Sequence, residues 1–174
     1  MNQLSATTQK SLAARFKFTR TMVVLFGVTV VIYLLVARIV SLGASRQASS
    51  EFYEAFRYAS LVMVGGGVLV AMMLRRVVLS RGQLQMAARK GVPAVLGRLS
   101  TVSIICAALG EVIGILGMAG TLLTGDSGFS LRLGIAGLLL IAYGFPRRWE
   151  WERVAAAAQA ASAEEAAPRE RIFQ

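Results

Sequence analysis

Four apolar tracts, each long enough to cross a bilayer, limit the folds open to this chain. They occupy residues 21–40, 58–74, 99–124 and 129–145. A helix of about 17–25 apolar residues spans the ~30 Å hydrocarbon core of a membrane. Inside lipid the backbone must satisfy its own hydrogen bonds, which favours helices, and alternation typical of a β-barrel is missing from the sequence. We therefore predict an all-α integral membrane protein, a four-helix bundle.

Arginines at the edges decide how long two of these tracts are. The first is uncharged from Thr21 to Ala37 and reaches Val40 if Arg38 extends toward the interface. The fourth has a short uncharged core unless Arg132 does the same. A cleaved secretory signal is the rival interpretation of the first tract, although that tract is longer than the ~7–15 residues of a signal core.

The basic residues predict the orientation. Of the nineteen Lys and Arg residues, fifteen fall in alternate segments of the chain. These fifteen are Lys10, Arg15, Lys17 and Arg20, then Arg75, Arg76, Arg81, Arg89, Lys90 and Arg98, then Arg147, Arg148, Arg153, Arg169 and Arg171. Cytoplasmic segments carry such an excess, so we predict both termini and the middle connection in the cytoplasm, N-in/C-in. The arginine-rich basic set and the compact spans suit a bacterial inner (plasma) membrane.

This topology divides the chain into three regions. Residues 1–20 form a basic tail that is cytoplasmic or interfacial, and residues 21–148 form the transmembrane domain. Residues 149–174 form a cytoplasmic tail rich in alanine and glutamate, and it begins with Trp149 and Trp151, which we interpret as interfacial aromatics.

Composition argues against several classes of function. The sequence contains no histidine, and its one cysteine, Cys106, lies in an apolar tract. We therefore expect no catalytic centre, no metal site and no cofactor. The net charge of +10 could suggest nucleic acid, but its distribution fits membrane orientation better, so the expected partners are the lipid bilayer and other membrane helices.

Glu111 stands near the centre of the third tract as its only charged residue. An ionisable group at that depth costs about 3 kcal/mol on insertion scales, and desolvation favours its protonated form. Such a carboxyl can bind and release a proton or a small cation, or it can stay neutral and donate a hydrogen bond to another helix. We expect supporting polar groups among Thr29, Tyr33, Ser103 and Tyr143.

Small residues form a ridge on the same tract, at steps of three and four. The ridge consists of Ser103, Ala107, Gly110, Gly114, Gly117 and Thr121. Ridges of this kind allow helix backbones to approach closely in lipid. Gly65, Gly66 and Gly67 lie at a similar depth in the second tract. We therefore expect the second and third spans to pack together at this level.

The run from Glu111 to Gly117 resembles the carboxylate helix of rotary ATP synthase c subunits (proteolipids), in which glycine follows the intramembrane carboxylate by six residues. The glycines of the second span and the basic connection resemble the rest of that helical hairpin. Consecutive glycines, a longer loop and two further spans depart from the family pattern. The overall plan is also similar to four-span bacterial membrane proteins that carry a glutamate in span three and a Phe-Pro-Arg end like Phe145 to Arg147.

Two functional hypotheses follow from these residues. The resemblance to proteolipids implies that Glu111 reversibly binds a proton or cation within an oligomer. The alternative is a structural or accessory subunit of a membrane complex, in which glycine-lined surfaces dock other helices and Glu111 is neutral. An enzymatic role is not expected.

Overall fold

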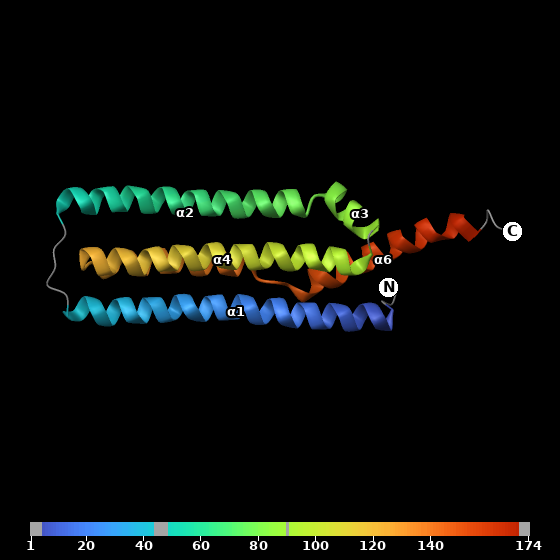
Figure 1. Ribbon diagram of the computed structural model, residues 1–174, viewed down its shortest axis with the longest axis horizontal. Coiled ribbons are helices and arrows are strands. Elements are labelled where there is room, and N and C mark those ends of the chain that lie inside the picture. The colour runs from blue at the N-terminus through green and yellow to red at the C-terminus, as the bar shows by residue number, and fades with distance from the viewer. Residues whose placement is uncertain (1–4, 44–48, 90, 171–174) are drawn as a thin grey trace. The chain divides into compact units, whose positions relative to one another are not determined.

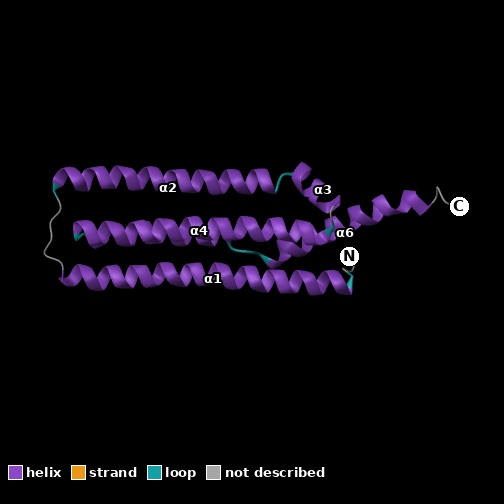
Figure 2. Cartoon of the chain, in the orientation of Figure 1, coloured by secondary structure: helices purple, strands orange, loops and turns teal. Residues whose placement is uncertain are grey.

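The computed structural model describes residues 5–43, 49–89 and 91–170, and this part of the chain is helical without strands (Figure 2). The ends of both predicted tails and part of the first connection lie outside the described residues. The helices are α1 (Ala6–Gly43), α2 (Ser50–Val78), α3 (Arg81–Arg89), α4 (Val92–Thr124), α5 (Ser127–Gly144) and α6 (Arg148–Glu170) (Figure 1). The prediction of an all-α protein is confirmed.

Four helical segments are long and apolar enough to cross a membrane. They are Ala6–Gly43, Glu51–Val78, Val92–Thr124 and Ser127–Ala160. Each contains one of the predicted spans. The helices continue beyond those spans, most clearly in α1, whose polar first turns lead without a break into the apolar tract.

The chain forms two compact units, each built from separate segments. Unit 1 consists of Met1–Thr21, Leu74–Ser103 and Pro146–Gln174, and unit 2 consists of Met22–Met73 and Ile104–Phe145. Nearly all of the predicted membrane residues belong to unit 2, apart from Leu99–Ser103 and the edge residues Thr21 and Leu74. Unit 1 combines the three segments that carry the excess of basic residues.

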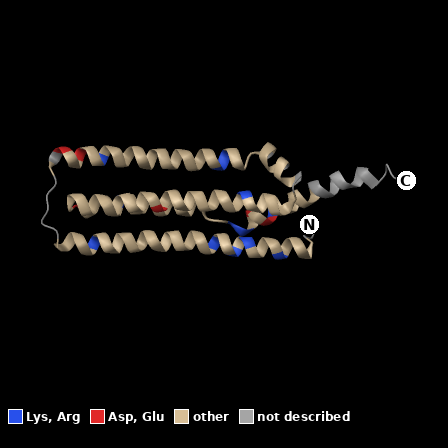
Figure 3. Ribbon diagram, viewed as in Figure 1, with Lys and Arg blue, Asp and Glu red and all other residues tan. Residues whose placement is uncertain are grey.

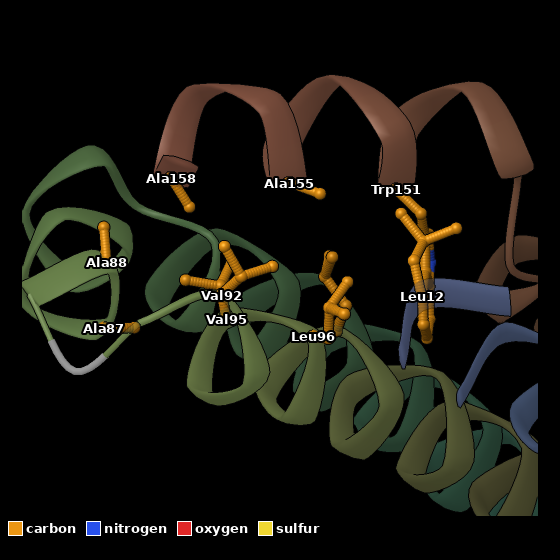
Figure 4. Close-up of a cluster of buried hydrophobic side chains, with 10 residues drawn as sticks. Leu12, Ala87, Ala88, Val92, Val95, Leu96, Trp151, Ala155 and Ala158 are labelled. Carbon is orange, nitrogen blue, oxygen red and sulfur yellow. The ribbon is translucent and has the colours of Figure 1, made fainter. Parts of the chain in front are cut away.

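Trp151 organises the core of unit 1. Its side chain is 2% exposed and packs edge-on against Phe16 of α1, with ring centroids 5.6 Å apart. Leu12 lies beside Trp151, and Ala155 and Ala158 continue this face of α6 along the first turns of α4 (Figure 4). The interpretation of Trp151 as an interfacial aromatic is therefore wrong, because its indole fills a protein core. Trp149, two residues earlier, is 53% exposed.

Unit 2 contains the later parts of α1 and α4, most of α2 and the whole of α5. Its core includes Val23 and Val30 of α1, Ala107 of α4 and Ile141 of α5. Large apolar side chains cover the outside of α1 and α2, for example Leu35 (59% exposed) and Val62 (74% exposed). Such a surface suits contact with lipid tails or with other apolar helices.

Candidate functional site

Glu111 lies in α4 between two helix contacts. Gly110, directly before it, faces α5, and Gly114, three residues after it, faces α1. The Glu111 side chain is half-buried. Within the described part of the chain it forms no hydrogen bond and no ion pair. A partner for this carboxyl would therefore have to come from outside those residues.

The four expected polar neighbours have other environments. The Thr29 hydroxyl donates a hydrogen bond to the Leu25 carbonyl of its own helix, at 3.0 Å. Tyr33 is half-buried, Ser103 is 7% exposed and Tyr143 is 41% exposed. None of the four is hydrogen-bonded to Glu111 in the described residues. The described chain also lacks any group of three or more acidic, cysteine or histidine side chains that could hold a metal ion.

The glycine ridge of α4 makes its close contacts with α5. A Cβ added to Gly110 would lie 2.5 Å from the carbonyl oxygen of Gly137, and a Cβ on Gly137 would collide with the carbonyl oxygen of Gly110. About two turns further along, a Cβ on Gly117 would lie 2.9 Å from the Leu133 Cβ. The two backbones approach this closely only because both helices carry glycine at the crossing.

Other members of the ridge face α1. A Cβ on Gly114 would lie 3.0 Å from Val30, and Ala107 is fully buried beside Val23 and Val30. The sequence led us to expect the second and third spans to pack together at this level, and it did not identify α5 or α1 as neighbours of the ridge. Depth along a span does not reveal which side of a helix a neighbour occupies. Gly134 and Gly137 of α5, which sequence reasoning missed, were signalled by their spacing of three.

The glycines of α2 lie in a different setting. A Cβ on Gly67 would lie 3.3 Å from the Ile113 side chain, so α2 and α4 do meet at this level. Gly65 and Gly66 are exposed, and an added Cβ would have no atom within 4 Å on either residue. These two glycines therefore serve no close contact in the described chain.

A hydrogen-bonded junction joins α4 to α5 and was not foreseen from the sequence. Gly125, with φ of +75°, ends α4, and Asp126 caps α5 by accepting a 2.7 Å hydrogen bond from the Gly128 amide. The other carboxylate oxygen of Asp126 accepts a 2.9 Å bond from the Tyr53 hydroxyl of α2. The signal in the sequence was the Gly-Asp-Ser-Gly run between two apolar tracts, which is typical of a cap after a turn.

Side chains around this junction hold it in place. The Thr121 hydroxyl donates to the Asp126 carbonyl at 3.0 Å and accepts from the Ser130 amide at 3.1 Å. Phe129 packs edge-on against the rings of Tyr53 and Phe56, each 5.1 Å away. This arrangement fixes the ends of three helices, and its polar groups are used in structure rather than left open for a ligand.

No family model, curated protein or solved structure matches the chain. The likeness of the second and third spans to the proteolipid hairpin is therefore a hypothesis, which depends on Glu111 and the glycines alone.

Proposed function

We propose that this is a multi-pass protein of the bacterial inner membrane with both termini and the middle connection in the cytoplasm. The distribution of basic residues supports this orientation. A second argument comes from unit 1, because its three segments pack together and must lie on one side of the membrane. Two spans separate the first segment from the second, and two more separate the second from the third. An even number of crossings in each interval agrees with four spans.

Within the membrane we infer a non-enzymatic role, that of an accessory or structural subunit that docks other membrane helices. The observation that carries this proposal is the open pair Gly65 and Gly66 in the middle of α2. Glycine inside a helix costs about 1 kcal/mol relative to alanine. Gly110, Gly114 and Gly117 offset that cost through close contacts within the chain. Gly65 and Gly66 have no such contact, so a helix from outside the chain is the natural source of one.

Replacement of Gly66 by leucine tests the docking role. The full-length protein, extracted into nanodiscs directly from native membranes, should carry more than one polypeptide per particle when counted by single-molecule fluorescence. Gly66→Leu should shift the distribution toward single chains, since bulk at the contact separates the backbones. Ala142→Leu, which adds similar bulk at an exposed site of α5, is the matched control. Single wild-type chains, or equal effects of both substitutions, would contradict the proposal.

Proton binding at Glu111 is a second candidate, supported by the half-buried carboxyl that lacks a partner in the described chain. A lone carboxyl in apolar surroundings suits a proton better than a metal ion, which requires several ligands. Assembly and proton binding are compatible, because a docked helix could cover the same side chain.

The carboxyl reagent dicyclohexylcarbodiimide reacts with protonated acids in apolar surroundings. We expect it to label the protein in membranes, more slowly as the pH rises, and not to label Glu111→Gln. An infrared carboxyl band that responds to pH would support reversible proton binding. A band that is constant with pH would favour a neutral structural glutamate, and labelling that fails at every pH would contradict a dry site.

A further inference from the structure

The basic residues of unit 1 fall into two groups that the sequence alone does not separate. In the first group the cation has a partner. Arg75 lies 3.3 Å from the Glu150 carboxylate, Arg98 donates to the Gln83 side chain at 2.6 Å, and Arg148 lies 2.7 Å from Glu152. Arg153 lies over the Trp149 ring, 5.1 Å from its centroid. Arg75 thus joins α2 to α6 and Arg98 joins α4 to α3, whereas Arg148 and Arg153 interact within α6.

In the second group the cation is exposed and has no acidic partner among the described residues. The group includes Lys10, Arg15, Lys17, Arg20, Arg76 and Arg147. Four of these, Lys17, Arg20, Arg76 and Arg147, stand at the end of an apolar tract. Lys17 and Arg20 precede the first, Arg76 follows the second, and Arg147 follows the fourth. Figure 3 shows lysine and arginine along the N-terminal part of α1 and at the start of α6.

We propose that Lys17, Arg20, Arg76 and Arg147 bind the phosphate groups of anionic phospholipids in the leaflet next to unit 1. Side chains at the ends of spans extend into the headgroup layer while their stems lie along apolar surface. A cation near an anionic leaflet gains about fivefold in association. The exposed indole of Trp149, two residues after Arg147, is the type of side chain that lies at the same depth.

The position of these cations favours a lipid over a soluble polyanion. A nucleic acid or an acidic protein requires a basic surface that projects into water. Here the four cations of the proposal lie within about one turn of an apolar tract, and Arg75 and Arg98, which also border such tracts, are already paired. The positive charge of these four unpaired side chains is therefore at the depth of the headgroup layer in the proposed arrangement. The proposal requires insertion in a bilayer but does not depend on helix docking through Gly66.

Both tryptophans of the chain belong to unit 1 and provide an intrinsic probe. The full-length protein is placed in nanodiscs of phosphatidylcholine mixed in equal parts with phosphatidylglycerol, with bromine on the acyl chains of one lipid or the other. We expect brominated phosphatidylglycerol to quench more strongly than brominated phosphatidylcholine. The preference should weaken at high salt, because screening reduces the attraction. Added inorganic phosphate at matched ionic strength should not reduce it further, which separates a headgroup site from a free-phosphate site.

Two variants with equal charge complete the test. The quadruple variant Lys17→Gln, Arg20→Gln, Arg76→Gln and Arg147→Gln should lose the preference for phosphatidylglycerol by at least about tenfold. The control Arg57→Gln, Arg132→Gln, Arg148→Gln and Arg153→Gln should keep it. Unchanged tryptophan emission in lipid without bromine verifies the fold of both variants. No preference in the wild type, or the same loss in both variants, would overturn the proposal.

Discussion

At the scale of single residues, the crossing of Gly110 and Gly137 sets a sharp limit on substitution. Gly110→Ala or Gly137→Ala would place a methyl group against backbone oxygen, which cannot move without separating α4 from α5. Overpacking of this kind costs about 1–3 kcal/mol. We therefore expect a clear loss of thermal stability in detergent for either variant.

Gly66→Ala is the control for that experiment. Its methyl group would meet no atom within 4 Å, so the substitution leaves the packing of the chain unchanged. Alanine is also the better helix former by about 1 kcal/mol. The thermal stability of the isolated chain should be unchanged or higher. Equal destabilisation by Gly66→Ala and Gly110→Ala would show that the α4–α5 crossing is not the tight contact described above.

The glycine sites illustrate what residue spacing can and cannot predict. Steps of three and four placed Gly110, Gly114 and Gly117 on one face of a helix, and the structure has them on the buried side of α4. The partner helix could not be predicted in the same way. Both α2 and α5 offer glycine near the middle of the predicted span. Only the assembled bundle determines that Gly137 rather than Gly66 meets Gly110.

At the scale of elements, the link between α4 and α5 depends on one cap. Asp126→Ala removes the acceptor for the Gly128 amide and for the Tyr53 hydroxyl, and loss of an N-cap costs about 1 kcal/mol of stability. Asp126→Asn keeps a capping oxygen, so we expect its thermal unfolding temperature to be closer to that of the wild type than the temperature of Asp126→Ala. Should both substitutions prove neutral, the cap would contribute nothing to the junction.

Helix α6 shows how an element can be predicted correctly while its environment is missed. An alanine-rich tail favours a helix, and α6 is one. Tryptophan beside the end of a span suggests the interface, which describes the exposed Trp149 but not the buried Trp151. Their spacing of two puts them on different sides of a helix. Only the approach of α1 and α4 decides which side becomes a core.

Trp151→Ala should therefore destabilise unit 1 selectively. Truncation of a buried tryptophan costs about 3–5 kcal/mol, which is a large part of the stability of a small unit. Hydrogen exchange should accelerate in the amides of α3, α6 and the first turns of α1 and α4. Trp149→Ala removes an exposed ring and should leave exchange nearly unchanged. Similar exchange in the two variants would mean that the core around Trp151 does not hold unit 1 together.

At the scale of the whole molecule, the packing of unit 1 bears on the proposed membrane topology of the chain. Ser100 and Thr19, from segments 81 residues apart, share a 2.7 Å hydrogen bond in this unit, and Arg75 pairs with Glu150 across a similar separation. In a four-span protein, contacts of this kind form only if α1 begins, α2 ends and α5 ends on the same side of the bilayer. The sequence predicted this arrangement from charge, and the contacts give a separate physical reason for it.

Cysteine labelling can test that arrangement directly. The native Cys106 is buried and can first be replaced by alanine. Single cysteines are then placed at three exposed positions, Gln9, Arg153 and Glu51. In intact bacterial spheroplasts a membrane-impermeant maleimide should label the Glu51→Cys chain, because the proposed topology places this site outside. The Gln9→Cys and Arg153→Cys chains should label only after the membrane is permeabilised.

If Gln9→Cys and Arg153→Cys behave differently from each other, unit 1 cannot form as described, since its segments would lie on opposite sides. If the two agree with each other but label from outside while Glu51→Cys does not, unit 1 would stand and the cytoplasmic orientation would be wrong.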